Sequence, residues 1–221
     1  MTGKRIRVMV VDDHAVVREG YRRLLEKQPD IEVIAEAEDA ASAYTRFRAT
    51  APDVVIMDIS MPGRGGIDAI RQIRQTDPTA RILVFSMHAT VSYAVQAIRA
   101  GARGYITKSS ASELMVEAVR NVFKNKLTLC GEISEALATS RLEENTDALD
   151  QLSPREFEVL RMIIDARSTD EIASAFHLTP KTVANYHYAI KSKLGVSSDI
   201  DLVYFCMRQG MVTPLAGDAV R

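Results

Sequence analysis

The chain has 221 residues, an apolar fraction of 47% and a formal net charge of −1. This length suggests one or two domains, and the apolar fraction is sufficient for ordinary hydrophobic cores. The apolar runs are too short to span a bilayer, and no charged-then-apolar leader opens the chain, so we expect a cytoplasmic protein with no membrane partner. The near-neutral charge means that any nucleic-acid binding must rest on a local basic patch.

The first half alternates short β-branched runs with longer helical patterns. The predicted strands are 5–11, 31–36, 53–58, 81–86 and 104–107. The predicted helices are 14–28, 39–50, 66–76, 90–100 and 111–124. This alternation predicts an α/β domain over 4–126, with a doubly wound, five-stranded parallel sheet and helices on both of its faces.

The pattern changes at residues 127–149. The apolar content falls there, and the run 143–147 is polar and acidic. We expect a linker that contains one short helix near 131–141 and is flexible after it.

The rest of the chain is predicted to be helical, as a small all-α domain over 150–212. Ser153, Pro154 and Glu156 have the spacing of a helix start with a capping box. A second helix is expected to begin at Ser168 or Thr169 and to run through 176. A third covers 179–194 and ends at a glycine, and a fourth covers roughly 198–209.

Charged side chains follow three of the predicted strands. Asp12 and Asp13 follow the first strand, Asp58 ends the third and Lys108 follows the fifth. The carboxyl ends of parallel strands meet at one edge, where open α/β sheets bind their ligands. Crowded carboxylates favour a hard cation such as Mg²⁺, and a carboxylate at Asp58 can attack phosphorus to form an aspartyl phosphate. Lys108 would neutralise charge in the transition state, and Ser86 would donate to a phosphoryl oxygen.

Three segments carry a resemblance to a known family. Residues 10–14 (VVDDH), 57–63 (MDISMPG) and 101–108 (GARGYITK) resemble the receiver domain of two-component response regulators, over about 4–126. The resemblance implies that a sensor histidine kinase phosphorylates Asp58 and that Mg²⁺ is the cofactor. The implied metal ligands are Asp12, Asp13, Asp58 and the backbone carbonyl of Ser60.

The same resemblance implies a switch. Ser86 and Tyr105 would be its hydroxyl and aromatic members, and Lys108 would contact the phosphoryl group. Phosphorylation would draw Ser86 inward, let Tyr105 rotate and bias a surface built from 88–120. The roles of His14 and His88, near the edge of the site, stay open.

The C-terminal region also resembles a family module. Residues 152–156 (LSPRE), 171–173 (EIA), 178–183 (LTPKTV) and 191–196 (KSKLGV) resemble the LuxR-type helix-turn-helix of NarL/FixJ-type response regulators. The helix 179–194 would then enter the major groove of promoter DNA. The candidate DNA contacts are Lys181, Thr182, Ala184, Asn185, Tyr188, Lys191 and Lys193. Asn185 is suited to adenine, Tyr188 to a base edge or phosphate, and the lysines and Thr182 to phosphates.

Charge in this region is segregated rather than abundant. Residues 151–212 hold seven basic and seven acidic side chains, whereas 172–198 hold three lysines and no acid. One such domain would bind DNA with modest affinity, so we expect a phosphorylation-dependent homodimer on paired half-sites.

Three alternatives compete with this interpretation. A metal-dependent aspartyl phosphatase usually has a second aspartate two residues after its nucleophile, where this chain has Ser60. A nucleotide-binding enzyme would have a glycine-rich loop after the first strand, where 13–16 read DHAV. In the third alternative, the receiver is retained and the C-terminal helices bind a protein partner instead of DNA. We expect no enzymatic activity beyond the receiver's own phosphoryl transfer and dephosphorylation.

Overall fold

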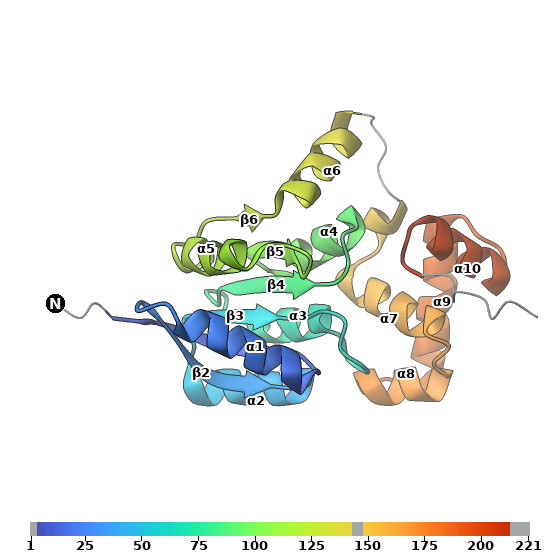
Figure 1. Cartoon of the computed structure of the whole chain (residues 1–221). Helices are drawn as coiled ribbons and strands as arrows, with labels where there is room; N and C mark the ends of the chain where they lie inside the picture. Colours follow the sequence, from blue (N-terminus) through green and yellow to red (C-terminus); the bar gives the residue numbers. More distant parts are fainter. Residues whose placement is uncertain (1–3, 143–147, 213–221) are drawn as a thin grey trace, which may run out of the picture. The chain divides into compact units, whose positions relative to one another are not determined.

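A computed structural model describes residues 4–142 and 148–212 (Figure 1). The chain divides into two compact units, Met1–Thr146 and Asp147–Arg221. The flexible segment predicted at 143–147 lies outside the described residues. Within the described residues, no helix combines the length and the apolar character that a membrane span requires.

The first unit is built on a parallel sheet, as predicted, with one additional strand. The strands are β1 (Ile6–Val11), β2 (Ile31–Ala37), β3 (Val54–Met57), β4 (Ile82–Ser86), β5 (Gly104–Thr107) and β6 (Thr128–Leu129). Their order is β2-β1-β3-β4-β5-β6, and each neighbouring pair is parallel. The five predicted strands are all present. The sixth is a two-residue strand that extends the sheet into the segment predicted as a linker.

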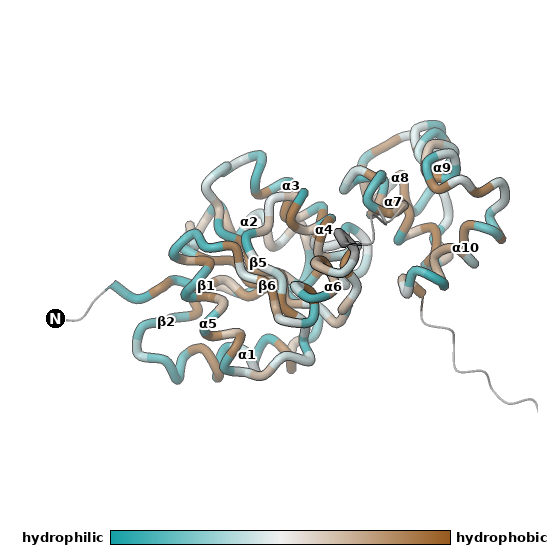
Figure 2. The backbone as a smooth tube through the Cα atoms, turned by 90° about the horizontal axis from the view of Figure 1, so that it is seen from above, coloured by the Kyte–Doolittle hydropathy of each residue, from teal (hydrophilic) through white to brown (hydrophobic). Residues whose placement is uncertain are grey.

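Five helices cover both faces of this sheet. They are α1 (Ala15–Glu26), α2 (Ala40–Thr50), α3 (Gly66–Thr76), α4 (Val91–Ala100) and α5 (Ser112–Phe123), and a further helix, α6 (Gly131–Leu142), follows β6 and contacts α4. Figure 2 shows α1 and α5 on one side of the strands and α2, α3 and α4 on the other. Every residue of β3, β4 and β5 is buried, which is expected for parallel strands that helices cover on both faces.

Strand register brings the ends of the central strands to one edge. Val11 pairs with Met57, and Ser86 pairs with Thr107. The hydrogen bonds continue one residue further, because Asp58 N donates to the Val11 carbonyl at 2.9 Å and Lys108 N donates to the Ser86 carbonyl at 2.7 Å. The polar residues after the strands therefore start from backbone positions that the sheet itself fixes.

Gly66, the first residue of α3, allows a close backbone approach beneath this edge. A Cβ atom at this position would lie 2.1 Å from the carbonyl oxygen of Asp58. Only glycine lets α3 start so near the loop that carries Asp58.

The second unit is helical. It contains the short 3₁₀ helix η1 (Ala148–Gln151), then α7 (Pro154–Ile164), α8 (Thr169–Phe176), α9 (Pro180–Leu194) and α10 (Asp199–Arg208). The four predicted helices are confirmed. Ser153 and Glu156 form the predicted capping box, and Ser168 caps α8 in the same way. Apolar side chains of α7, α8 and α9 are buried together, among them Phe157, Ile172, Phe176, Val183 and Ile190.

Candidate functional site

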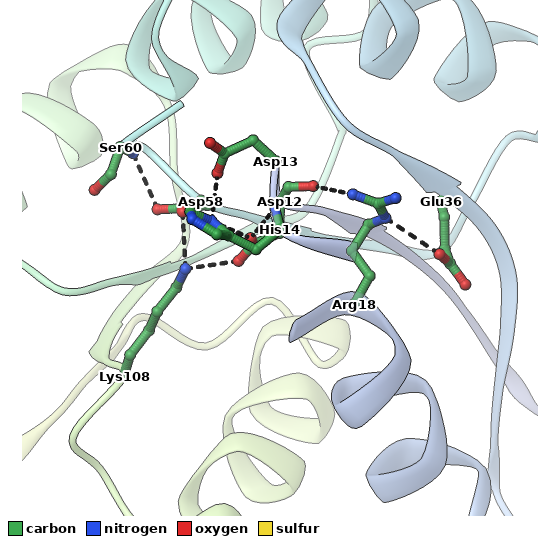
Figure 3. Close-up of polar contacts among 8 residues, drawn as sticks. All are labelled: Asp12, Asp13, His14, Arg18, Glu36, Asp58, Ser60 and Lys108. Carbon is green, nitrogen blue, oxygen red and sulfur yellow. Dashed lines mark hydrogen bonds and ion pairs between the residues drawn. The ribbon is translucent and has the colours of Figure 1, made fainter. Parts of the chain in front are cut away.

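Two buried carboxylates share one lysine at the carboxyl edge of the sheet. Asp12 and Asp58 are only 1% and 2% exposed. Lys108 Nζ donates to Asp12 Oδ2 at 2.6 Å and to Asp58 Oδ2 at 2.8 Å (Figure 3). Burial lowers the pKa of Lys108, but its hydrogen bonds to both carboxylates outweigh that effect, and the pKa is raised. The structure thus joins three of the predicted site residues, which are far apart in the sequence.

Main-chain groups fix the other oxygen of each buried carboxylate. His14 N donates to Asp12 Oδ1 at 2.9 Å, and Ser60 N donates to Asp58 Oδ1 at 3.0 Å. Each aspartate thus accepts from the backbone two residues later, which is the geometry of an Asx turn. Both carboxylates are held in place by their own loops before any ligand arrives.

Asp13 is the third acid of this edge, after Asp12 and Asp58, and its hydrogen bonding differs from theirs. Its Oδ1 lies 2.9 Å from His14 Nδ1, and the ligand atoms of Asp12, Asp13 and His14 lie within 4.8 Å of one another. Among the residues that the structure describes, Asp13 Oδ1 is buried without a hydrogen-bond donor of acceptable geometry. A buried carboxylate oxygen without such a donor, beside the carboxylate of Asp12, fits a hard divalent cation, because such cations prefer oxygen ligands.

The two predicted switch residues meet at the loop between β4 and α4. Ser86 is fully buried, and its Oγ accepts from His88 N at 3.1 Å. The buried Tyr105 hydroxyl donates to the His88 carbonyl at 2.7 Å, and burial raises the pKa of Tyr105. The His88 ring stacks on Tyr93 with 4.0 Å between centroids. His88, whose role was left open, is therefore the residue through which both hydroxyls contact this loop.

The outer face of α9 carries most of the predicted DNA contacts. Lys181, Ala184, Asn185 and Tyr188 are exposed and recur at helical spacing, and Tyr188 is 76% exposed. The opposite face of α9 is buried against α7 and α8. Thr182 is half-buried, and its Oγ1 lies 2.9 Å from that of the cap residue Thr179.

The other two lysines of α9 form ion pairs inside their own unit. Lys191 Nζ lies 2.9 Å from Asp199 Oδ1, and Lys193 Nζ lies 2.6 Å from Glu156 Oε2. Burial alone would raise the pKa of Glu156, but hydrogen bonds from Lys193 and Ser153 outweigh it, and the pKa is lowered. The sequence pattern did not anticipate these two pairs.

One contact to the Asp12–His14 loop was also missed from the sequence. Arg18, on α1, donates from Nη1 to the Asp12 carbonyl at 2.6 Å, and its Nε lies 3.3 Å from Glu36 Oε2 (Figure 3). The available signal was the position of Arg18, one helical turn after the Asp12–His14 loop.

Comparisons with known proteins identify the family of each of the two units. Residues 8–120 match the response regulator receiver domain, and 150–206 match the luxR family of bacterial regulatory proteins. The response regulator UvrY from Escherichia coli strain K12 is 36% identical over 208 residues, which cover 93% of this chain and 95% of UvrY. The response regulator GacA from Pseudomonas viridiflava is 35% identical over 209 residues, which cover 94% of this chain and 98% of GacA.

Solved structures extend the comparison. RcsB from Salmonella enterica serovar Typhimurium, bound to the rprA promoter with the phosphomimetic BeF₃⁻, has a TM-score of 0.74 and 26% identity. That match covers 91% of this chain and 98% of the RcsB chain. A LuxR-family two-component response regulator from Aurantimonas sp. SI85-9A1 is 47% identical with a TM-score of 0.62, and covers 63% of this chain and 99% of its own.

A receiver domain followed by a luxR-family helical domain spans almost the whole chain, and the relatives match it over nearly their full length. The luxR match also decides between the two interpretations of the C-terminal helices, in favour of DNA binding over a protein-partner module. The chain belongs to the response regulators of the NarL/FixJ type and is a DNA-binding transcription regulator of a two-component system.

Proposed function

We propose that Asp58 is the residue that accepts the phosphoryl group, with a sensor histidine kinase as the donor. The observation that carries this proposal is the pair of short contacts from Lys108 to Asp58 and Asp12. Asp58 ends the central strand β3, and its two oxygens are oriented by Lys108 and by Ser60 N–H. An Asp58 oxygen attacks phosphorus, the phosphorus–nitrogen bond to the donor histidine breaks, and its electron pair returns to the imidazole.

The acids at this edge would also hold Mg²⁺. The proposed ligands are the carboxylates of Asp12, Asp13 and Asp58 and the backbone carbonyl of Ser60, and the unsatisfied Oδ1 of Asp13 supports this assignment. When bound, the cation neutralises charge on the transferring phosphoryl group. The ammonium of Lys108 lies within hydrogen-bond distance of Asp58 and supplies a second positive charge there. We expect the protein to catalyse its own phosphorylation and dephosphorylation and no other reaction.

Ser86 and Tyr105 would report the phosphoryl group to the surface. Both contact the backbone of His88. If the Ser86 hydroxyl turns to donate to a phosphoryl oxygen, His88 N loses the acceptor that it has in this structure. The β4–α4 loop would then shift. The affected surface is the predicted one, 88–120, which includes α4 and β5.

The C-terminal unit would read promoter DNA with the outer face of α9. We propose that Asn185 and Tyr188 contact bases, that Lys181 and Thr182 contact phosphates, and that Ala184 permits close approach. Lys191 and Lys193 would contact phosphates only in competition with Asp199 and Glu156, so we expect their contribution to be smaller.

We further propose that two copies bind paired half-sites through α10. Ile200 and Tyr204 are 68% and 63% exposed on this helix, and with Val203 and Met207 they form an apolar strip. One RcsB structure, 28% identical to this chain, is described as two dimers bound to two parallel DNAs. Because the DNA and the kinase's phosphodonor must be accessible, we place this activity in the cytoplasm.

The proposed domain division is 4–126 for the receiver, 127–149 for the linker and 150–212 for the DNA-binding domain. Two structural details refine it. The strand β6 attaches residues 128–129 to the receiver sheet, and η1 precedes the capped start of α7.

Acyl-phosphate labelling tests the phosphoryl site. Wild-type protein is incubated with acetyl phosphate and Mg²⁺, and the phosphorylated fraction is separated on a phosphate-binding gel. Asp58→Asn should remove the label, whereas Asp77→Asn, at the C-cap of α3, should label like wild type. Retained label on Asp58→Asn would overturn the assignment.

Binding to a selected DNA pool tests the proposed DNA contacts of α9. Lys181→Ala should weaken binding to all sequences alike and reduce the salt dependence, whereas Asn185→Ala should change the preferred sequence. An unchanged preference would remove Asn185 from the base-reading residues. Beryllofluoride with Mg²⁺ should favour the dimer in sedimentation and tighten DNA binding; equal binding without it would refute phosphorylation control.

A further inference from the structure

Arg18 connects the metal-binding loop to the rest of the receiver. Its backbone N–H donates to the His14 carbonyl at 3.1 Å, and this hydrogen bond belongs to the start of α1. Its side chain turns back and donates from Nη1 to the Asp12 carbonyl at 2.6 Å. One residue therefore contacts both ends of the three-residue loop 12–14 that carries Asp12 and Asp13. Figure 3 shows the contact from the Arg18 side chain to Asp12.

The guanidinium is itself held by a neighbouring strand. Its Nε lies 3.3 Å from Glu36 Oε2, on β2, and the Arg18 side chain is 14% exposed. The other oxygen of that carboxylate, Glu36 Oε1, accepts from Arg22 Nε at 2.6 Å. Low exposure reduces solvent screening, and a planar guanidinium holds its donors in a rigid fork, whereas the donors of a lysine ammonium rotate.

The contact from Arg18 to the Asp12 carbonyl affects where the Asp12 side chain lies. Asp12 Oδ1 and Oδ2 accept from His14 N and from Lys108 Nζ, so the orientation of this carboxylate depends on the backbone at residue 12. The Asp12 N–H donates to the Ala37 carbonyl of β2 at 3.1 Å. With the carbonyl held by Arg18, the two peptide groups that flank the Cα of Asp12 are both fixed by hydrogen bonds.

We propose that Arg18, oriented by Glu36, is a positioning residue for the metal-binding acids of the phosphoryl site. It donates to the backbone carbonyl of Asp12 rather than to a carboxylate oxygen, and acts by keeping Asp12 and Asp13 in the geometry that a divalent cation requires. The inference rests on the proposed function of this site. Residues that orient metal ligands typically change metal affinity by about 10–100-fold when they are substituted.

The test measures Mg²⁺ binding directly, by isothermal titration calorimetry of the full chain with MgCl₂. Arg18→Gln should weaken Mg²⁺ binding roughly tenfold, the lower end of the range for such residues. Arg22→Gln is the matched control, because Arg22 binds the same glutamate but lies one turn further along α1, where its side chain donates to the Val33 carbonyl of β2. It should leave the Mg²⁺ affinity within about twofold of wild type, because such a residue does not orient the ligands.

A kinetic readout separates positioning from general structural damage. With acetyl phosphate as donor, Arg18→Gln should raise the half-saturating Mg²⁺ concentration by the same factor and leave the rate at saturating Mg²⁺ within about twofold. Glu36→Gln should produce a smaller shift. The double variant should match Arg18→Gln alone, since Glu36 acts on the loop through Arg18.

The outcomes distinguish the two proposals. If wild-type protein takes up no Mg²⁺ and is not labelled, the proposed function fails. If wild type binds Mg²⁺ but Arg18→Gln binds equally well, or if Arg22→Gln loses as much affinity, the positioning role of Arg18 is wrong and the proposed function stands. Arg18→Lys supplies the check on folding: it should melt like wild type and yet recover only part of the lost affinity.

Discussion

Replacing Lys108 by methionine should destabilise the receiver in the absence of Mg²⁺. The substitution keeps the length of the side chain but removes the donor that Asp12 and Asp58 share at 2.6 and 2.8 Å. Two carboxylates that are 1% and 2% exposed then lose their common counter-charge. Removing one partner of a buried ion pair costs about 3–5 kcal/mol.

The lower end of that range applies here. Each carboxylate keeps its main-chain donor, His14 N for Asp12 and Ser60 N for Asp58. We therefore expect a loss of about 3 kcal/mol in the free energy of unfolding of the receiver. For a unit of this size, each kcal/mol corresponds to about 3–4 °C, so its Tm should fall by roughly 10 °C.

Differential scanning calorimetry of the full chain in EDTA measures this shift, with Lys124→Met as the control at an exposed lysine. Mg²⁺ at roughly one hundred times its Kd should restore about 2.7 kcal/mol to the variant. At the same Mg²⁺ concentration wild type should gain less stability, because its lysine already compensates the acids and it therefore binds the cation more weakly. An unchanged Tm for Lys108→Met in EDTA would refute this electrostatic reasoning.

Three further results are expected. Gly66→Ala should lower receiver stability by about 2 kcal/mol and reduce acyl-phosphate labelling, because its Cβ meets the Asp58 carbonyl, whereas Gly20→Ala, which meets no heavy atom within 4 Å, should do neither. Glu156→Gln should cost the helical unit about 1–2 kcal/mol at pH 7 in denaturant unfolding. Because the pKa of Glu156 is lowered by folding, this difference should shrink as the pH falls below 4.5 and vanish once the carboxyl is protonated in both states; a constant difference would contradict it. Ile200→Asp should abolish cooperative binding to paired half-sites in a gel shift without weakening binding to one half-site, and retained cooperativity would exclude α10 as the dimer surface.

The edge of the sheet that carries the acidic residues and Lys108 could be predicted because strand ends are visible in the sequence. In β3, four buried apolar residues end at Asp58, and the parallel order of strands then requires the polar groups to meet. Helix starts were equally accessible, since the capping box of Ser153 and Glu156 is a local pattern. The strand β6 was not, because two residues carry no periodicity and form a strand only by pairing with β5.

Side-chain partners were the part that local patterns could not supply. Charge counting treated Lys193 as a free cation of the DNA face, but Glu156 lies 37 residues earlier and reaches it only through the packing of α7 against α9. Likewise, Arg18 is a polar residue of an amphipathic helix in the sequence. Its contact with the Asp12 carbonyl depends on how α1 is set against β1 and β2.

The two faces of α9 separate folding from recognition. Val183, Ile190 and Leu194 anchor the helix in the core, whereas Lys181 and Asn185 face solvent. Substitutions on the outer face therefore leave the core packing intact, and surface changes of this kind usually alter stability by less than about 0.5 kcal/mol. If this face reads DNA as proposed, a few substitutions on one helix could change the preferred sequence without altering the fold of the unit or the receiver domain.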